Sequence, residues 1–527
     1  MGTQTTVPIQ NLRINSPPNL IKNTKDPSFK LLYSPQRHDP KYGTVKPEAS
    51  LGNLYLAAAL RDNKFDVDVL DCCIGGKKHT MDEAFNNTTP LPNGMVRVGL
   101  ASETIIRECQ DYDVIGMSSI FTPQTHMVED TVRLIRQAYP DKLIIMGGIN
   151  ARTQLKRYFD AGADLICLSE AEGAIVEIGN TLRVGSRNFS HISGIAFMSN
   201  GKVQINPTGI ISDDLDSLPI PARDLLPNER IWEINRPHGG VLKPGDLFKP
   251  QPYVSMQTSR GCPYTCKFCH ISSEVEGSLM GNIGKFRYQS VERVEREAVA
   301  IKALGANYIY IEDDSLLARK KRALAIFKML IKYGFKLGDV NGVNLSHLHK
   351  NNGSGRLIID DEMLETMAEA GFNRLSFPVE SGSQDMIDQW AAEKISHTRY
   401  DIAALIKKAN SLGIEVSSCY LIGYPNETYE QLVETLKAAQ KHLDAGSAYV
   451  NFTMVTPFPG TALYDYCVQN DFLLPGIDIA DLNWMEPSMK TKIDPWFLKF
   501  ISRKAYEYIN KPERLEVIRS MVPKIDS

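Results

Sequence analysis

Three closely spaced cysteines are the residues of this chain best suited to chemistry. Cys262, Cys266 and Cys269 share the run 261–270 with a C-x3-C-x2-C spacing. Thiolates are the usual protein ligands of iron–sulfur clusters, and three of them can hold three irons of a four-iron cluster while the fourth stays open. An open iron is a place where a small molecule can bind and react. The spacing therefore predicts a catalytic [4Fe-4S] cluster in one short loop.

A structural zinc ion is the alternative for these cysteines. Structural zinc normally takes four protein ligands, often from paired C-x2-C units. The nearest fourth candidate is His270, which directly follows Cys269. Two adjacent residues rarely reach the same ion, so the missing fourth protein ligand favours a cluster with one open iron. Three unrelated core cysteines are a further alternative, and the regular spacing speaks against it.

The triplet and its surroundings resemble the radical S-adenosylmethionine (radical SAM) family, whose signature is three such cysteines in a loop after the first barrel strand. Residues 252–259 form an extended, β-branched run of the strand type, and Arg260 and Gly261 lead from it into the cysteine loop. The resemblance implies that S-adenosylmethionine (SAM) is the fourth ligand of the cluster. It also implies reductive cleavage of SAM to a 5'-deoxyadenosyl radical, which removes hydrogen from an unreactive C–H bond.

Strand-like and helical stretches alternate after the cysteines, which predicts a partial (β/α)6 barrel of the TIM type. Strands are expected over 307–312, 372–380, 416–422 and 449–455, and helices near 320–333, 384–392 and 429–442. Ligands collect at the carboxyl ends of such strands. The resemblance implies SAM contacts from the cysteine loop and these strand ends, at Phe268, Glu312, Asp313, Asp314, Glu380 and Gly423. Ordinary solvated turns are the alternative for the acidic trio and for the turn at Gly423.

The first half of the chain also alternates strands and helices, which predicts a doubly wound, Rossmann-like sheet over residues 30–199. Strands are expected over 31–34, 67–70, 114–119, 143–147 and 165–169, and helices over 51–63 and 127–139. This arrangement ahead of the cysteines resembles the cobalamin-binding domain of many radical SAM enzymes. The resemblance implies cobalamin contacts from small or polar residues in the turns, at Ser118, Ser119, Gly147, Gly148, Glu170 and Gly173.

The sequence departs from one cobalamin-binding pattern, because it lacks the Asp-x-His-x-x-Gly motif that ligates cobalt in some domains of this type. His38 and His126 are the histidines nearest to the expected binding turns, and surface or capping roles are their alternatives. Radical SAM members commonly lack the motif, so cobalamin without a protein ligand on that face is compatible with the sequence. A degenerate domain that binds no cofactor is the other alternative.

The combined resemblance is to class B radical SAM methyltransferases. It implies methylation of an unactivated carbon of a small-molecule or peptide substrate, by way of the 5'-deoxyadenosyl radical and methylcobalamin. A cobalamin-binding radical SAM cyclase or oxidoreductase is the alternative function, since both use the same two domains. An electron donor such as flavodoxin or ferredoxin is the implied partner. No catalytic side chain is assigned from the sequence.

Composition agrees with this class of enzyme. The chain has 527 residues, 43% of them hydrophobic, and a formal net charge of -3, which gives no signature for nucleic-acid binding. No apolar run is long enough to cross a membrane and no signal sequence begins the chain, so a reducing cytoplasm is expected. The expected organisation is a leader (1–29), a cobalamin-binding domain (30–199), a linker (200–250), a radical SAM core (251–470) and a helical C-terminal region (471–527).

Overall fold

The computed structural model describes residues 26–40, 45, 51–209, 211–234, 252–353, 357–392 and 394–509. The chain forms two compact units. Unit 1 takes in Met1–Ile211, Leu218–Arg230 and Glu276–Asn282, and unit 2 takes in Ser212–Ser217, Ile231–Val275 and Ile283–Ser527. The chain therefore passes between the units more than once. Most of the expected leader, and residues 235–250 of the expected linker, lie outside the described residues.

Unit 1 is built on a seven-stranded sheet with the strand order β10-β9-β8-β7-β6-β1-β3. Five of these strands are parallel: β1 (Phe29–Tyr33), β3 (Val67–Asp71), β6 (Val114–Ser118), β7 (Leu143–Gly147) and β8 (Leu165–Cys167). The edge strands β9 (Ile195–Ser199) and β10 (Lys202–Asn206) are antiparallel. Because β10 falls within 200–250, the sheet runs beyond residue 199, where the cobalamin-binding domain was expected to end.

The order of the parallel strands puts a topological switch point between β1 and β6, where ligands bind in folds of this kind. Phe29 of β1 lies opposite Val67 of β3 and Val114 of β6. All five residues of β1 are buried, as expected for a central parallel strand covered on both faces. The predicted doubly wound sheet is confirmed.

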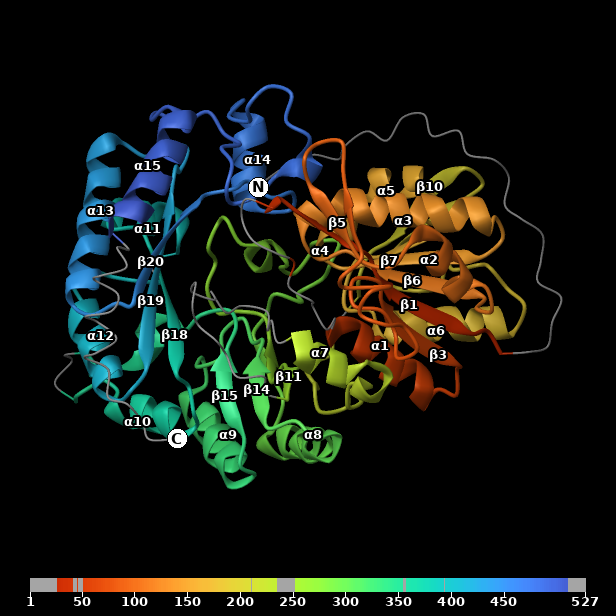
Figure 1. The fold of residues 1–527 in the computed structure, drawn as a ribbon, viewed down its shortest axis with the longest axis horizontal. Helices are drawn as coiled ribbons and strands as arrows, with labels where there is room; N and C mark the ends of the chain where they lie inside the picture. Colours follow the sequence, from red (N-terminus) through yellow and green to blue (C-terminus); the bar gives the residue numbers. More distant parts are fainter. Residues whose placement is uncertain are drawn as a thin grey trace. The chain divides into compact units, whose positions relative to one another are not determined.

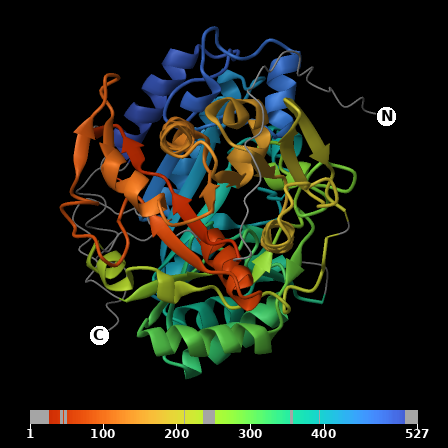
Figure 2. The same ribbon diagram turned by 90° about the vertical axis from the view of Figure 1, so that its right-hand side faces the viewer.

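Helices cover both faces of this sheet (Figures 1 and 2). On one face α1 (Leu51–Asp62) packs against α6 (Glu172–Arg183), and on the other α3 (Thr125–Ala138) packs against α2 (Ser102–Cys109) and α5 (Leu155–Ala161). The short helix η2 (Thr122–Gln124) precedes α3, and α4 (Ile149–Thr153) follows β7. A small sheet joins β2 (Gln36–His38), β5 (Val96–Val98) and β4 (Thr88–Pro90).

Unit 2 contains two three-stranded parallel sheets that together form a partial barrel (Figure 1). One consists of β11 (Tyr253–Met256), β14 (Tyr308–Ile311) and β15 (Lys336–Asp339), the other of β18 (Arg374–Glu380), β19 (Glu415–Ile422) and β20 (Tyr449–Met454). The surrounding helices are α8 (Val291–Leu304), α9 (Lys320–Lys332), α10 (Asp361–Glu369), α11 (Gln384–Trp390), α12 (Ile402–Ser411) and α13 (Tyr429–Asp444). The predicted partial barrel is confirmed.

Shorter elements complete unit 2. The cysteine loop is flanked by the pair β12 (Ser259–Arg260) and β13 (Arg287–Tyr288) and by η4 (His270–Ser273). The segment between β15 and β18 holds η5 (Leu345–Leu348), β16 (His349–Asn351) and β17 (Leu357–Ile359). The predicted C-terminal helical region contains η6 (Ile479–Asp481) and α15 (Pro495–Ile509), and α14 (Ala462–Gln469) precedes it.

Residues that alternate along the barrel strands divide into an apolar and a polar set. Fully buried residues such as Phe377 and Val416 belong to one large apolar core. The half-buried positions between them include Tyr310, Ser376, Cys419 and Asn451. Because successive side chains of a strand point to opposite faces, these polar residues face the lumen of the barrel while the apolar residues face the helices. The barrel therefore has a polar interior.

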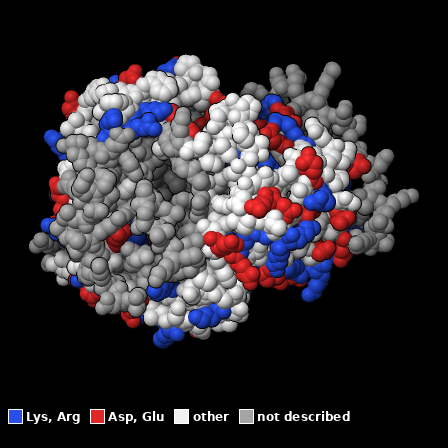
Figure 3. Space-filling model, viewed as in Figure 1, with Lys and Arg blue, Asp and Glu red and all other residues white. Residues whose placement is uncertain are grey.

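Charged side chains of both signs are interspersed on the described part of the face in Figure 3. This mixture agrees with the small net charge of -3. Within the described ranges, no helix combines the length and the apolar composition that a membrane span requires.

Candidate active site

The cysteine loop lies directly after β11 and β12, at the carboxyl end of the first barrel strand. Its backbone is fixed at several points: the Cys262 N–H donates to the Gly284 carbonyl at 3.1 Å, and the Lys267 N–H donates to the Trp390 carbonyl at 2.8 Å. Gly261 starts the loop with φ +77°, and a Cβ there would come within 2.4 Å of the Lys285 carbonyl oxygen. Only glycine fits this close approach of two backbones.

The structure brings the three thiols close enough to interact electrostatically. Burial raises the pKa of Cys266 to about 11 and of Cys269 to about 12. Cys266 Sγ donates a weak hydrogen bond to the Ala391 carbonyl at 3.5 Å. Thiols held near one another in this way fit an iron–sulfur cluster, which takes its ligands as thiolates.

His270, the nearest fourth ligand for a zinc ion, is turned to another partner. Its Nε2 donates a hydrogen bond to the Pro459 carbonyl at 2.9 Å, and its ring stacks near that of Phe458. Nε2 therefore carries the proton, and Nδ1 is the ring nitrogen with a lone pair. Because a histidine that ligates a metal commonly donates its other ring N–H to a carbonyl, this hydrogen bond does not decide between zinc and a cluster.

Asp313, predicted to contact SAM, also holds the end of β14 to the segment before the cysteine loop. Its carboxylate is fully buried. It accepts hydrogen bonds from the Thr258 N–H at 2.5 Å, the Thr258 hydroxyl at 2.6 Å and the Ser259 hydroxyl at 2.7 Å. These bonds tie the end of β14 to the segment that leads into the cysteine loop. The SAM contact predicted for Asp313 stays a prediction.

The neighbouring Asp314 has the opposite environment. Its side chain is reachable by solvent. Desolvation by the surrounding protein, followed by the negative charge of Asp313, nevertheless raises the pKa of Asp314 to about 7. Glu312 is half-buried, and its backbone carbonyl accepts a hydrogen bond from the Asn341 amide at 3.0 Å. Of the acidic trio, Asp314 is therefore the residue most available to a ligand.

Glu380 ends β18 in a conformation that is unusual for a residue with a side chain. Its φ is +66°, and the pairing between β18 and β19 is irregular between Pro378 and Glu380. Its carboxylate is buried and forms an ion pair with Lys394. Lys394 was not predicted, because the lysine follows α11 in a segment without a motif. The SAM contact predicted for Glu380 stays a prediction.

The turn after β19 is organised by a buried carboxylate. The Gly423 N–H donates to Glu427 Oε2 at 2.6 Å, and Glu427 is fully buried. Burial raises the pKa of Glu427 to about 7. Phe268 of the cysteine loop is half-buried, with its ring centroid 6.4 Å from that of the buried Tyr424. The fold therefore brings the predicted contacts Phe268 and Gly423 to neighbouring parts of unit 2.

In unit 1, the predicted cobalamin contacts lie at the carboxyl edge of the parallel strands. Ser118 is half-buried and ends β6, and Gly147 is half-buried and ends β7. Among the described residues, no heavy atom lies within 4 Å of the place that a Cβ of Gly147 would take. The backbone at the end of β7 is thus open to close approach, as the bulky corrin ring of cobalamin would require. Gly173 at the start of α6 is open in the same sense.

Ser119 and Gly148, also predicted as cobalamin contacts, make contacts within the protein at this edge, and their contacts to cobalamin stay predictions. Ser119 is fully buried, and its hydroxyl is 2.8 Å from both the Tyr158 hydroxyl and the Asn150 amide nitrogen. Gly148 has φ +97°, and a Cβ there would come within 2.4 Å of the Ser119 carbonyl oxygen. The small residues at these two positions are explained by contacts within the protein.

A network of buried polar side chains next to the carboxyl ends of β6 and β7 was not predicted from the sequence. The Asn150 amide also donates to the Tyr158 hydroxyl at 2.7 Å and to the Thr125 hydroxyl at 3.0 Å. Gln154 bonds to both Asn150 and Thr125. These side chains come from α3, α4 and α5, and they join the turns after β6 and β7. Glu170, the remaining predicted contact, is half-buried and attracts the guanidinium of Arg152 electrostatically.

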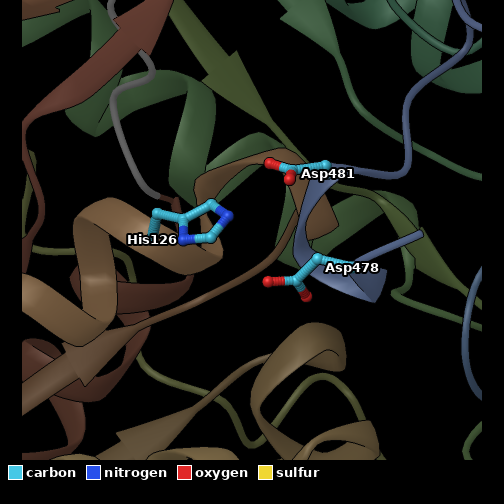
Figure 4. Close-up of side chains that lie close together, drawn as sticks. All are labelled: His126, Asp478 and Asp481. Atoms are coloured by element: carbon cyan, nitrogen blue, oxygen red, sulfur yellow. The ribbon is translucent and has the colours of Figure 1, made fainter. Parts of the chain in front are cut away.

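The two histidines considered for cobalt belong to different parts of unit 1. His38 ends β2 in the small sheet, whereas His126 is half-buried in the first turn of α3. Figure 4 draws His126 together with Asp478, which precedes η6 of unit 2, and Asp481, the last residue of η6. Asp478 caps η6 by accepting the Ala480 N–H at 2.9 Å. Because His126 and these carboxylates belong to different units, no common ligand set is assigned to them.

Comparison with known proteins identifies both units. Residues 256–439 match the radical SAM superfamily, and residues 46–179 match the B12 binding domain. The chain is 27% identical to an uncharacterized methyltransferase of Pyrococcus horikoshii over 391 residues, 72% of this chain and 75% of that protein. It is 26% identical over 461 residues to the cytidylyl-2-hydroxyethylphosphonate methyltransferase of Streptomyces wedmorensis, 81% of this chain and 79% of that protein.

The fold is also that of a solved structure, the cobalamin-dependent S-adenosylmethionine radical enzyme OxsB with aqua-cobalamin bound. The TM-score is 0.68 at 15% identity, with 94% of this chain and 71% of that chain covered. The two matched domains give the cofactors of the chain: a [4Fe-4S] cluster and SAM for unit 2, and cobalamin for unit 1. The chain is thus a member of the radical SAM superfamily that carries a B12-binding domain ahead of its radical SAM domain.

Proposed function

We propose that this protein is a cobalamin-dependent radical SAM methyltransferase that methylates an unactivated carbon of a small-molecule or peptide substrate. One observation carries the proposal. The same chain has a cysteine loop on the first strand of a barrel and, in unit 1, a doubly wound sheet whose carboxyl edge is open at Gly147. The methyltransferase names of the relatives in Pyrococcus horikoshii and Streptomyces wedmorensis support the type of reaction.

Cys262, Cys266 and Cys269 hold the cluster in this proposal, and SAM lies against the neighbouring strand ends. Asp314 is the acidic residue offered to its amino group, because Asp313 is occupied by Thr258 and Ser259. The Gly423 turn, which Glu427 supports, is offered to the adenine. When bound, the cofactors supply a 5'-deoxyadenosyl radical and a cobalt-carried methyl group, while the protein orients them and excludes water.

The lumen of the barrel is the proposed place of the substrate carbon. Its half-buried residues Tyr310, Ser376, Cys419 and Asn451 offer hydroxyl, thiol and amide groups. A substrate with hydrogen-bonding groups suits such a lining. Members of the superfamily need a one-electron reductant, and flavodoxin or ferredoxin is the proposed donor. The oxygen-sensitive cluster and the reduced thiols favour a cytoplasmic location.

Cofactor content and SAM products test this proposal. The full chain is purified without oxygen from cells supplied with cobalamin, the cluster is reconstituted, and iron, cobalt and corrinoid are measured. Near four irons and one corrinoid per chain are expected. With SAM and dithionite, both S-adenosylhomocysteine and 5'-deoxyadenosine should form, since one reports methyl transfer to cobalt and the other reports radical formation.

Two outcomes would contradict the proposal. Iron without corrinoid would remove the role of cobalamin. Corrinoid and 5'-deoxyadenosine without any S-adenosylhomocysteine would favour a cyclase or oxidoreductase that transfers no methyl group. The matched control is the same preparation from cells without cobalamin, which should form 5'-deoxyadenosine but no S-adenosylhomocysteine.

A further inference from the structure

Lys394 and Glu380 form a buried pair of opposite charges in unit 2. The side chains are 11% and 9% exposed, and Lys394 Nζ donates to Glu380 Oε1. Glu380 reaches this position with φ +66°, a left-handed conformation that costs a residue with a side chain about 1–3 kcal/mol. Backbone strain of this kind persists only where the surrounding structure holds the residue in place, and it is common at functional sites. SAM binding to Glu380 does not explain the lysine that occupies its carboxylate.

The segment that carries Lys394 is bonded to the cysteine loop. The Lys394 N–H donates to the Ala391 carbonyl at 3.2 Å, and the same carbonyl is the partner of Cys266 Sγ at 3.5 Å. One residue earlier, the Trp390 carbonyl accepts the N–H of Lys267, the residue after Cys266. The backbone that precedes Lys394 is therefore tethered to the cysteine loop at Cys266 and Lys267.

The electrostatics agree with this placement. Burial disfavours the charge of Lys394, but the attraction of Glu380 and then of Cys266 keeps its pKa above the usual value for lysine. Burial raises the pKa of Cys266, and of the two opposing charges the lysine acts on it more strongly than the glutamate. The charges of Lys394 and Glu380 therefore act on this cluster ligand with opposite signs.

We propose that the Lys394–Glu380 pair sets the reduction potential of the cluster, with the ammonium raising it and the carboxylate lowering it. The inference rests on the cluster part of the proposed function. Reduction by one electron adds negative charge at Cys266 and its fellow ligands. A neighbouring ammonium in a poorly solvated place favours that charge, because little water is present to screen it. Net charge near the sulfurs is one of the factors that set cluster potentials.

The proposal predicts shifts of opposite sign for two isosteric changes. Lys394→Met removes the positive charge and makes the cluster harder to reduce, by about tenfold in the equilibrium constant, which is about 59 mV for a one-electron couple. Glu380→Gln removes the negative charge and makes reduction easier by a smaller factor. The double variant has a potential between those of Lys394→Met and wild type, since the lysine acts more strongly on Cys266.

The experiment is an EPR-monitored redox titration of the reconstituted full chain without SAM, cobalamin or substrate. Lys394→Arg keeps the positive charge and should keep the wild-type potential, which guards against a variant that merely disturbs packing. Lys267→Met is the matched control, because this lysine is next to Cys266 but exposed to solvent. Its removal should shift the equilibrium constant less than twofold, since water screens exposed charges.

The outcomes distinguish tuning of the cluster potential by the Lys394–Glu380 pair from general disturbance of the loop. Opposite shifts for Lys394→Met and Glu380→Gln, with little change in Lys394→Arg, support the inference. Shifts in the same direction, or unchanged potentials in cluster-loaded variants, overturn it, since general disturbance of the loop acts in one direction only. If the wild-type chain itself gives no cluster signal, the cluster part of the proposed function fails instead. The two failures are therefore distinguishable.

Discussion

The carboxylate of Asp313 accepts the backbone N–H of Thr258 at 2.5 Å and so joins the ends of two neighbouring barrel strands. Asp313 follows β14, and Thr258 lies between β11 and β12. This bond fixes the segment from which the cysteine loop departs. It also directs the next residue, Asp314, away from this interaction and toward solvent. Adjacent aspartates thus have separate roles, one in the framework and one offered to a ligand.

Replacement of each aspartate by asparagine should separate these roles. Asp313→Asn puts an NH2 group opposite donors and should lower the free energy of unfolding of unit 2 by roughly 1–3 kcal/mol. Asp314→Asn should change it by less than about 0.5 kcal/mol and should weaken SAM binding about tenfold. Urea unfolding followed by tryptophan fluorescence suits the test, because all four tryptophans belong to unit 2. Equal losses of stability in both variants would contradict the assignment.

Each cysteine of the triplet should be needed for the cluster. Cys262→Ala, Cys266→Ala and Cys269→Ala should each abolish 5'-deoxyadenosine formation and reduce the bound iron after reconstitution. Cys167→Ala is the control, because this cysteine is buried in β8 of unit 1 and should not affect iron content. Iron assay and product analysis by mass spectrometry are the measurements. Wild-type amounts of product in any triplet variant would remove the cluster assignment.

The adjacent glycines after β7 should respond differently to an added methyl group. In Gly148→Ala the added methyl group would clash with the Ser119 carbonyl oxygen, and the alanine would have to adopt a positive φ. The substitution should therefore destabilise unit 1 by at least about 2 kcal/mol. Gly147→Ala meets no protein atom within 4 Å and should leave the fold intact. Its methyl group occupies the space offered to cobalamin and should weaken binding by roughly tenfold. Absorbance titration with aquacobalamin measures this effect.

A wild-type cobalamin affinity in Gly147→Ala would show that the ligand does not approach this backbone. Gly185→Ala serves as a control, because it lies after α6, away from the carboxyl edge, in open space. Gly185 also has a positive φ, so Gly185→Ala should lower the stability of unit 1 without lowering the affinity for cobalamin.

The stability of unit 2 should depend on pH through Glu427. Its pKa is about 7 in the fold, compared with the ordinary value of 4.5, because the carboxyl group is buried. The fold therefore holds the proton more tightly than the unfolded chain does. This contribution is fully present below pH 4.5 and is lost as the pH rises through 7. At 1.36 kcal/mol per pH unit, it amounts to at most roughly 3 kcal/mol.

Glu427→Gln should remove this pH dependence while keeping an acceptor for the Gly423 N–H. The urea midpoint of unit 2, followed by tryptophan fluorescence, should fall between pH 5 and pH 8 in the wild-type chain and fall less in the variant. A variant with the same slope as the wild-type chain would assign the pH dependence to other groups.

The sequence allowed good prediction wherever a local pattern carries the information. Apolar runs such as that of β1 and the helical periodicity of α13 predicted elements that the structure confirms to within a residue or two. Their alternation predicted both fold classes. Roles within the turns were less predictable, because a small residue such as Gly148 suits a ligand and a neighbouring backbone equally well. The contact between Gly148 and the Ser119 carbonyl appears only after folding.

By itself, the sequence determined the donors and the framework: three thiols at a spacing that suits one cluster, and a strand and helix pattern that allows two α/β units. Tertiary structure decided which polar groups face a ligand and which face each other. Asp313 and Ser119 form hydrogen bonds within the protein, and Lys394 was brought to Glu380. The physical reason is that periodicity fixes which face of an element is buried, whereas partners far apart in the chain meet only when loops set the elements in place.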